Sequence, residues 1–368
     1  MKIAIVGGGP AGAYLGYCLA KEGISATIFD DSHPREKPCG GGISSFAIRK
    51  FPILHEIPVG KAESTQIKII SPKGREAIVE GEMESWAISR KHLDMFLLKK
   101  AKEEGAKLVK ERVENFEKVK GIWKIKTKKR VFKADLIVGA DGANSIVRKK
   151  LLGPIPKENM GICFGCFAKD PTSKTTIIKF LEGKHGYGWV FPREDHLSIG
   201  VGTELRYGKI VKNEFERFMT SYATNAKPFS TWAAILPLVK NPKFFQLPTC
   251  GKDWMVIGDA AGHVDPITGE GITYAMWSAE IASKAIGKND VLLFDKMWKK
   301  AYGYNLIKGS EMRNLFFNSS VLEISIWLAS KSKTFGKILY ELINSDQDYY
   351  TFEKRVLIEL PKILWELV

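Results

Sequence analysis

The sequence lacks the long apolar runs of membrane-spanning proteins and the cysteine density of disulfide scaffolds. Across 368 residues, no apolar stretch approaches the roughly 18 residues that a spanning helix needs. The chain begins Met1-Lys2 and enters a short apolar strand directly, without the apolar region and cleavage site of a signal peptide. Five cysteines in a chain of this length do not make a disulfide framework. We therefore expect a cytoplasmic protein. If it associates with a membrane, we expect that contact to be peripheral.

Patterns typical of metal sites and nucleic-acid-binding modules are also missing. The C-x-x-C pair Cys163 and Cys166 lies in a run expected to be a strand, where residues three apart face opposite sides. No second pair of ligands completes a four-ligand set. The lysines are dispersed, and no zinc-finger or RNP-like spacing occurs. We predict no metal site and no nucleic-acid partner.

Acidic residues are fewer than basic ones. The chain has 56 Lys and Arg against 41 Asp and Glu, so its formal charge is 56 − 41 = +15, with a pI near 9.4. This excess favours acidic partners such as anionic lipid headgroups or phosphorylated small molecules. It is equally compatible with a lysine-rich solvated surface.

The first strand leads into a nucleotide-binding motif. Residues 2–6 form a β-branched run that ends in G-x-G-x-x-G, and a helix follows to about residue 22. Such glycines give a tight turn, close backbone approach to a pyrophosphate and tight helix–strand packing, while the helix N-terminus favours an anion. An acidic residue ends the next strand, placed to accept a hydrogen bond from a ribose hydroxyl. The predicted contacts are Gly7, Gly9, Pro10, Ala11, Gly12 and Asp30, which do not distinguish NAD from FAD.

Two later strands end at acidic residues beside glycines. The first runs into Asp141-Gly142, and the second runs into Gly258-Asp259 and is followed by Gly269-Glu270-Gly271-Ile272. These segments resemble the "DG" and "GD" signatures of the flavoprotein group that includes the aromatic hydroxylases. The resemblance implies that Asp259 contacts the ribityl chain or pyrophosphate and that 269–272 lies along the isoalloxazine. It also implies that the 86–105 segment is a helix whose Arg90 approaches the flavin. The three signatures in this order predict FAD as cofactor.

Two further stretches narrow the family. Residues 37–42 read Lys-Pro-Cys-Gly-Gly-Gly, and residues 186–192 read Gly-Tyr-Gly-Trp-Val-Phe-Pro before a Gly-Val-Gly at 200–202. They resemble the PCGGG and Y-x-W-x-F-P…G-x-G motifs of geranylgeranyl reductases, a resemblance that covers roughly residues 1–285. The resemblance implies that Cys39, Gly40 and Gly41 lie near the flavin. It also implies substrate contacts at Tyr187, Trp189, Phe191 and Pro192.

Strand alternation supports an aromatic substrate wall. In a strand, Tyr187, Trp189 and Phe191 share one face, while Gly188 and Val190 leave the other nearly bare. An aromatic wall suits a prenyl chain, because its binding depends mainly on apolar area removed from water. The resemblance and this wall together lead us to predict catalytic roles for Cys39, Tyr187 and Trp189, and the resemblance alone implies that of Cys39. Cys39 is a candidate proton donor, redox partner or conformational latch.

The predicted function is FAD-dependent saturation of geranylgeranyl double bonds by hydride transfer, on archaeal-type ether lipid precursors. No second nucleotide motif occurs, so NAD(P)H visits transiently or a ferredoxin-like protein supplies electrons. The alternatives are a flavin hydroxylase or halogenase of the same fold, or a membrane quinone reductase. The Trp-x-Trp-x-Ile stretch expected of a halogenase is absent.

The predicted fold is α/β, with a Rossmann-like FAD-binding domain, an antiparallel substrate domain and a helical C-terminal region. The FAD-binding domain is expected to be discontinuous, at 1–60, 86–150 and 250–285, with a three-stranded meander near 113–132. The substrate domain takes 61–85 and 151–249. Residues 286–368 are expected to be helical. Their apolar stripes, at 324–328 and 356–368, are expected to pack, with peripheral contact with anionic lipid as the alternative.

Three single-residue hypotheses remain. Pro361 is expected to start or kink the last helix. A disulfide between Cys39 and Cys250 is one hypothesis for the Gly-rich loop. His263 lies near Asp259 in sequence and is either a flavin neighbour or a structural residue.

Overall fold

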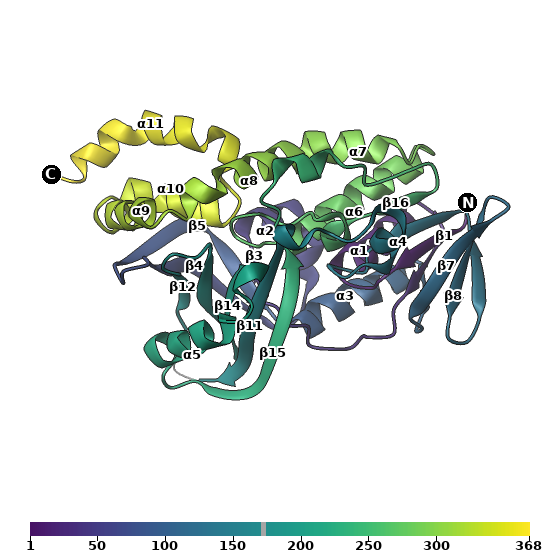
Figure 1. Cartoon of the computed structure of the whole chain (residues 1–368), viewed down its shortest axis with the longest axis horizontal. Coiled ribbons are helices and arrows are strands. Elements are labelled where there is room, and N and C mark those ends of the chain that lie inside the picture. Colours follow the sequence, from purple (N-terminus) through teal and green to yellow (C-terminus); the bar gives the residue numbers. More distant parts are fainter. Residues whose placement is uncertain (171–173) are drawn as a thin grey trace.

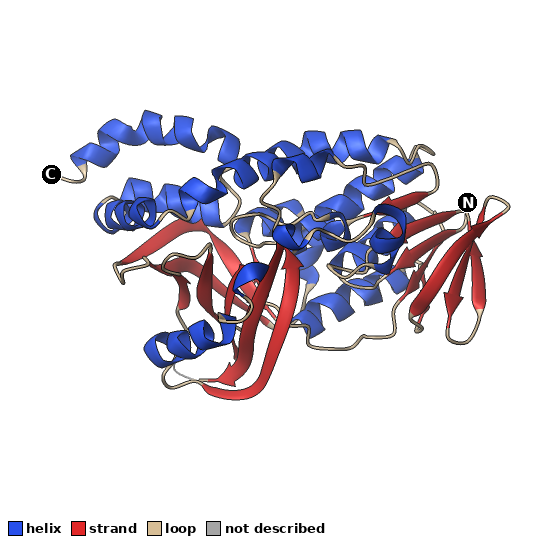
Figure 2. Cartoon of the chain, in the orientation of Figure 1, coloured by secondary structure: helices blue, strands red, loops and turns tan. Residues whose placement is uncertain are grey.

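The computed structural model describes residues 1–170 and 174–368 and shows an α/β protein built on two large sheets (Figures 1 and 2). A five-stranded parallel sheet and a small meander lie near the N-terminus. An eight-stranded sheet lies towards the opposite end, and helices of the C-terminal third run along both. The predicted fold class is confirmed.

The parallel sheet has the strand order β16-β10-β1-β2-β6, and its strands come from distant parts of the chain. They are β1 (Ile3–Val6), β2 (Ala26–Phe29), β6 (Lys107–Val109), β10 (Leu136–Gly139) and β16 (Trp254–Val256). Every residue of β1 and β10 is buried, as expected for a sheet covered on both faces. Ile3 and Ile5 face α1 (Pro10–Lys21), α3 (Arg90–Glu103) and α6 (Ile272–Gly287). Ala4 and Val6 face the meander and α4 (Ile146–Leu152).

The meander is confirmed as predicted. It consists of β7 (Val113–Val119), β8 (Ile122–Thr127) and β9 (Val131–Ala134), all antiparallel. The expected 86–105 helix is shorter, because residues 86–88 end strand β5 and α3 begins at Arg90.

The eight-stranded sheet has the order β15-β11-β14-β13-β12-β4-β5-β3. Its strands are β3 (Gly42–Ile43), β4 (Lys61–Ile70), β5 (Glu76–Ile88), β11 (Met160–Lys169), β12 (Thr176–Phe180), β13 (Gly186–Pro192), β14 (Leu197–Glu204) and β15 (Lys227–Pro237). Neighbours are antiparallel except β12 and β4, which pair in parallel and join the two segments of the sheet. Helix α5 (Val211–Tyr222) covers β11, β13 and β14 on one face.

The C-terminal region is helical, as predicted. It contains α7 (Leu293–Trp298), the π-helical turn η6 (Lys299–Gly303), α8 (Tyr304–Phe316), α9 (Ser319–Lys331), α10 (Lys333–Ile343) and α11 (Tyr349–Trp365). Helices α9 and α10 pack on β5, and α11 packs on α8 and α10. The short elements are α2 (Ser45–Lys50) and the 3-10 turns η1 (Pro52–Glu56), η2 (Lys157–Asn159), η3 (Leu205–Tyr207), η4 (Pro242–Gln246) and η5 (Gly258–Ala261).

The expectations for the last helix have separate outcomes. Pro361 does not start α11, which begins after Asp348, whose carboxylate accepts from the backbone N–H of Thr351 at 2.7 Å; the proline lies inside the helix, and a kink there stays a prediction. The 356–368 stripe is largely exposed rather than packed, with Leu357 68% and Trp365 81% exposed.

The cysteine hypotheses have separate outcomes. All five cysteines are free, so the Cys39–Cys250 disulfide is wrong; Cys250 packs in the core beneath the parallel sheet. Cys163 and Cys166 lie in β11 with their side chains in different clusters, on the Trp189 side and the α5 side respectively. Opposite faces are confirmed for this pair.

Candidate functional site

A cavity of about 590 Å³ extends from the parallel sheet to the eight-stranded sheet. Its walls come from the first glycine turn, the loop at Cys39, the loop that precedes α6, the face of β13 and the end of α8. Most of the site residues predicted from the sequence line it. Gly12, Gly258 and Pro192 lie outside its lining.

The glycines of the first turn differ in their surroundings. A Cβ on Gly7 would lie 2.4 Å from the carbonyl oxygen of Ala140, and Gly7 has φ +104°. A Cβ on Gly12 would lie 1.9 Å from the carbonyl oxygen of Gly7. At Gly9 the nearest atom is 4.0 Å away, on Arg90. Gly7 and Gly12 thus permit backbone packing, while Gly9 leaves the N-terminus of α1 open to the cavity.

An ion network fixes the rim at the end of β2. The Asp30 carboxylate accepts from the backbone N–H of Gly8 and of Ser32, both at 2.7 Å, and pairs with His33 at 2.8 Å. His33 also contacts Asp94 at 3.2 Å, and Asp94 forms a two-bond pair with Arg90 at 2.8 Å.

The pKa directions follow from this network. Burial opposes charge on each group, but the opposing partners prevail. They lower the pKa of Asp30 and raise the pKa of His33 to about 9. Arg90, which is 4% exposed, lines the cavity as a fixed cation rather than lying on a helix surface.

The Cys39 loop is held by the eight-stranded sheet. Arg193 donates to the carbonyl oxygens of Cys39 and Gly40, at 2.8 and 3.2 Å, and pairs with Glu36 at 2.8 Å. Ser198 also donates to the Cys39 carbonyl, at 3.0 Å. The thiol of Cys39 accepts from the Gly41 N–H at 3.3 Å. The loop therefore has a fixed position against β13 and β14.

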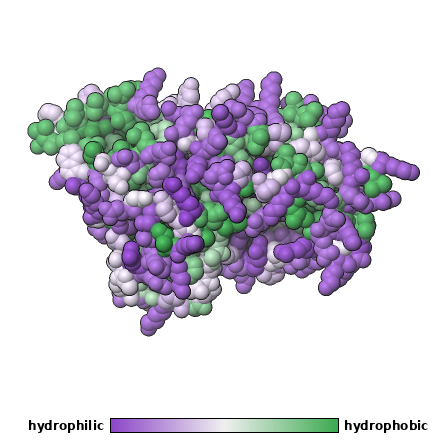
Figure 3. All heavy atoms as spheres, in the orientation of Figure 1, coloured by the Kyte–Doolittle hydropathy of each residue, from purple (hydrophilic) through white to green (hydrophobic). Residues whose placement is uncertain are grey.

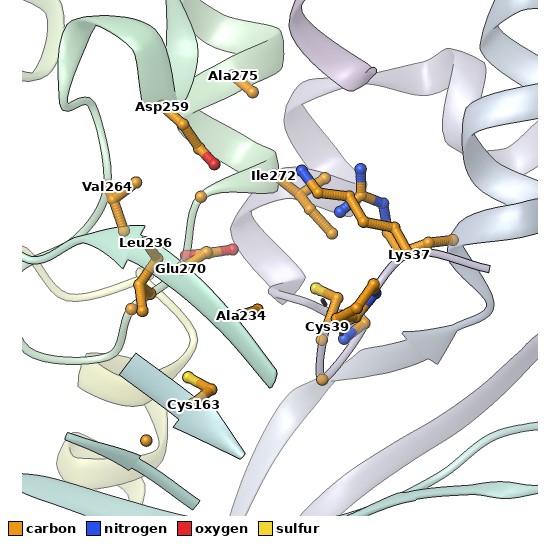
Figure 4. Close-up of a pocket in the computed structure, with 18 of the residues that line it drawn as sticks. Lys37, Cys39, Cys163, Ala234, Leu236, Asp259, Val264, Glu270, Ile272 and Ala275 are labelled. Carbon is orange, nitrogen blue, oxygen red and sulfur yellow. Dashed lines mark hydrogen bonds between the residues drawn. The ribbon is translucent and has the colours of Figure 1, made fainter. Parts of the chain in front are cut away.

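The opposite wall is the loop before α6. Figure 4 shows Asp259 and Glu270 projecting into the space from one side, with Cys39 and Lys37 on the other. Gly269, with φ +71°, Gly271 and Ile272 also line this wall, so the backbone and the N-terminus of α6 face the cavity.

Glu270 is a buried carboxyl within this wall. It accepts from the Ser345 hydroxyl at 2.7 Å, from the Ser44 N–H at 3.4 Å and from the Thr273 hydroxyl. Burial raises the pKa of Glu270, although these hydrogen bonds act in the other direction. The sequence motif predicts flavin contact for its neighbours Gly269 and Gly271 but not for Glu270 itself.

The aromatic wall faces the cavity, as its alternation predicts. Tyr187, Trp189 and Phe191 all line it, and Tyr187 donates a hydrogen bond to the carbonyl of Thr268. Trp189 stacks on Trp232, with ring centroids 6.1 Å apart. The opposite face of β13 is not bare, because Phe218 of α5 packs over Gly188.

Several lining residues were not found from the sequence. Phe316 and Phe317 come from the end of α8, in the tail that no motif covers. Arg193 does not line the cavity but holds the Cys39 loop; it follows the aromatic stretch directly, and its contact with residue 39 spans 154 positions. The sequence does carry a signal for Glu270, because its carboxylate lies between two glycines that face the cavity.

His263 is structural. It is fully buried, bonds the Tyr302 hydroxyl at 2.9 Å and packs on Trp298, and it lies outside the cavity lining. Burial lowers its pKa to about 3, so the ring is neutral.

The described residues form neither a helix that could span a membrane nor a cluster that could hold a metal ion. Among the residues that the structure describes, no helix combines the length and apolarity needed to cross a membrane. No group of three or more His, Cys, Asp or Glu side chains in the described part of the chain is arranged to hold a metal ion.

Comparisons with known proteins agree with the geometry. Residues 1–198 match the family described as "FAD binding domain". Geranylgeranyl diphosphate reductase of Rhodobacter capsulatus is 31% identical over 298 residues, covering 76% of this chain and 73% of that one. Digeranylgeranylglycerophospholipid reductase of Methanococcus vannielii is 25% identical, covering 78% and 77%.

A solved structure shares the fold. A geranylgeranyl bacteriochlorophyll reductase-like protein of Thermoplasma acidophilum superposes with a TM-score of 0.82 at 21% identity, covering 96% of this chain and 98% of that one.

Proposed function

Because this chain belongs to the geranylgeranyl reductase family of FAD-dependent oxidoreductases, we propose that it saturates carbon–carbon double bonds of geranylgeranyl chains carried on archaeal-type ether lipid precursors. One observation supports this most: the glycine turn at Gly9 and the aromatic wall at Trp189 line the same cavity. A cofactor held by the first can therefore lie against a chain held by the second.

The cavity fits FAD. The open N-terminus of α1 at Gly9 suits the pyrophosphate, because unpaired N–H groups and the helix dipole favour an anion. The fixed carboxylate of Asp30 suits a ribose hydroxyl, and Asp259 suits the ribityl chain. The space between the Cys39 loop and the 269–272 loop is assigned to the isoalloxazine, with Arg90 beside it.

The chemistry divides between cofactor and chain. When bound and reduced, FAD would supply a hydride to one alkene carbon, with NAD(P)H or a ferredoxin-like protein restoring its two electrons. The chain's own part would be to deliver a proton to the other carbon as the π bond is lost. Tyr187 and Trp189 hold the prenyl chain in place and exclude water, which an unactivated alkene requires.

We assign the proton donor to Glu270. Its carboxyl lines the cavity, and burial favours its protonated form. Cys39 is the other candidate, but its thiol already accepts from the Gly41 N–H and lies beside the Arg90 guanidinium.

Anaerobic incubation of dithionite-reduced holoprotein with a geranylgeranylated ether lipid in detergent tests the proposal. Mass spectrometry is expected to show gains in steps of two hydrogens as the flavin reoxidises. Trp189→Ala should lose these gains, whereas Trp327→Ala, on the surface of α9, should keep them.

Unchanged lipid alongside a flavin that quinone or oxygen readily reoxidises would contradict the proposal. Oxygen consumption in the presence of substrate would then indicate a hydroxylase, and its absence would indicate a quinone reductase.

The chain's location follows from the same substrate. A lipid precursor resides in a membrane, and the net charge of +15 favours an anionic surface. We propose peripheral association.

A further inference from the structure

The last helix carries a run of exposed apolar side chains. From 357 onwards, the exposed residues of α11 and the segment after it are Leu357, Ile358, Leu360, Pro361, Lys362, Leu364, Trp365 and Val368. Lys362 is the one charged residue in this set. Figure 3 shows the resulting apolar surface at the C-terminal end of the molecule. Single exposed apolar residues need no explanation, but a contiguous group of this kind marks an interaction surface.

The helix is two-sided. At about 100° per residue, Leu357, Pro361, Leu364 and Trp365 fall on one side. Ile363, which is 2% exposed, falls on the other and packs in the core shared with α8 and α10. The buried side accounts for the fold, so the exposed side has no structural role within the chain.

A small apolar chamber of about 80 Å³ lies beneath α11. Helices α8, α9, α10 and α11 enclose it, and Phe352 of α11 is in its wall. Phe180 and Phe316 belong both to its wall and to the wall of the large cavity. Apolar side chains therefore extend from α11 to the aromatic wall, and the rings of Phe180 and Phe316 separate the chamber from the large cavity.

Charge and side-chain type indicate what covers this surface. Lys354 and Lys362 are exposed on α11, and Lys331 and Lys333 are exposed at the junction of α9 and α10. Lysines beside an apolar face suit anionic headgroups above an acyl layer. Trp365 has the amphipathic ring typical of residues at the membrane interface. A second copy of this chain would bring the same lysines together.

We propose that the exposed face of α11 (Leu357, Ile358, Leu364 and Trp365) docks the protein on an anionic lipid bilayer, lying in the interface without crossing it. The inference rests on the proposed function, in which the substrate is a membrane lipid. Docking at α11 brings the chamber, and behind it the cavity, next to the layer that contains the prenyl chains.

Vesicle co-sedimentation of holoprotein tests the docking face. Binding to equimolar phosphatidylcholine and phosphatidylglycerol is expected to fall about tenfold or more in Leu364→Ser/Trp365→Ser, because two inserted apolar side chains are lost. The pair Leu357→Ser/Ile358→Ser should behave alike. The matched control Val131→Ser/Leu247→Ser, with exposed apolar residues far from α11, should bind as the wild type does.

Further readouts separate the outcomes. Vesicles of phosphatidylcholine alone should bind more weakly, and brominated lipid should quench fluorescence that Trp365→Phe lacks. Equal vesicle binding by both α11 variants and the control would overturn the inference. So would a dimer in light scattering that the α11 substitutions dissociate, which would assign the face to a second copy.

Activity distinguishes failure of docking from failure of the proposed function. With detergent-solubilised prenyl lipid, the α11 variants should reduce double bonds at the wild-type rate, and with vesicle-borne lipid they should not. A wild type that binds vesicles through α11 yet reduces no prenyl lipid in detergent would refute the proposed function and leave the docking face standing.

Discussion

Replacing Glu270 by glutamine tests the assignment of the proton donor. The substitution keeps the shape of the side chain, and the amide oxygen still accepts from the Ser44 N–H and the Thr273 hydroxyl. It removes the transferable proton. A positioned general acid contributes about 10²–10⁴-fold to a rate, so Glu270→Gln should slow prenyl reduction by that factor while binding FAD normally.

The pH dependence has a definite sign. Burial raises the pKa of Glu270 above its ordinary value of 4.5. The wild-type rate should therefore be full below the raised pKa and decline as pH rises through it. Its contribution to stability is likewise full below 4.5 and is lost as pH rises through the folded-state value. Each unit of difference between folded and unfolded pKa is worth about 1.4 kcal/mol.

Single-turnover reoxidation of the reduced flavin by prenyl lipid, followed anaerobically across pH, measures the rate. Urea unfolding across the same range measures the stability. The variant should lose both dependences. Asp265→Asn is the matched control: this carboxyl is buried, has a raised pKa and lies outside the cavity lining. It should alter stability and, because charge on Asp265 contributes to the raised pKa of Glu270, move the decline of the rate to lower pH without abolishing it. Wild-type rate and pH profile in Glu270→Gln would refute the assignment, and their loss in Cys39→Ser instead would transfer it to Cys39.

Four other substitutions probe the cavity walls and the loop that Arg193 holds. Gly7→Ala should destabilise the fold by about 2 kcal/mol or more, since the new Cβ strains a positive φ and collides with backbone atoms. Gly9→Ala should fold normally in urea titrations but retain less FAD absorbance after gel filtration. Arg193→Gln removes the ion-pair partner of Glu36 and should lower stability in urea by about 3 kcal/mol, the lower end for a broken buried pair, because Glu36 keeps some contact with solvent and the hydrogen bonds from Ser89 and the Arg90 N–H. Phe316→Ala removes a ring between the cavity and the chamber, and should raise the rate on prenyl chains longer than geranylgeranyl relative to geranylgeranyl; an unchanged ratio in mass spectrometry would show that the chamber does not accept substrate.

The cofactor side was readable from the sequence because its signals are local. A buried strand, a glycine turn and a helix start follow one another at Gly7–Pro10, and again at Asp141 and at Asp259. Each turn has its glycines and acidic residue within a few positions. Strand alternation likewise placed Tyr187, Trp189 and Phe191 on one face.

The rest depends on contacts between distant residues. The hydrogen bond from Arg193 to Cys39 joins positions 154 apart, and Ser345 reaches Glu270 across 75 positions. The parallel pairing of β4 with β12 is equally non-local. The apolar pattern of α11 predicts packing, whereas the structure exposes much of it, because a sequence shows periodicity but not what covers each side. The proposed domain limits stay a prediction, although β3, within 1–60, pairs in the eight-stranded sheet.

The interleaved order of the parallel sheet has a consequence for how the protein is made. Strand β16 closes the edge beside β10, and it lies at 254–256, after the entire eight-stranded sheet has been synthesised. Asp259 and the 269–272 loop emerge later still. A nascent chain on the ribosome can form β1, α1 and β2 early, but Asp259 and the 269–272 loop, which form the opposite wall of the cavity, have not yet been synthesised. Cofactor capture must therefore follow release of most of the chain, and the unfinished sheet depends until then on contacts of long sequence separation, which form slowly.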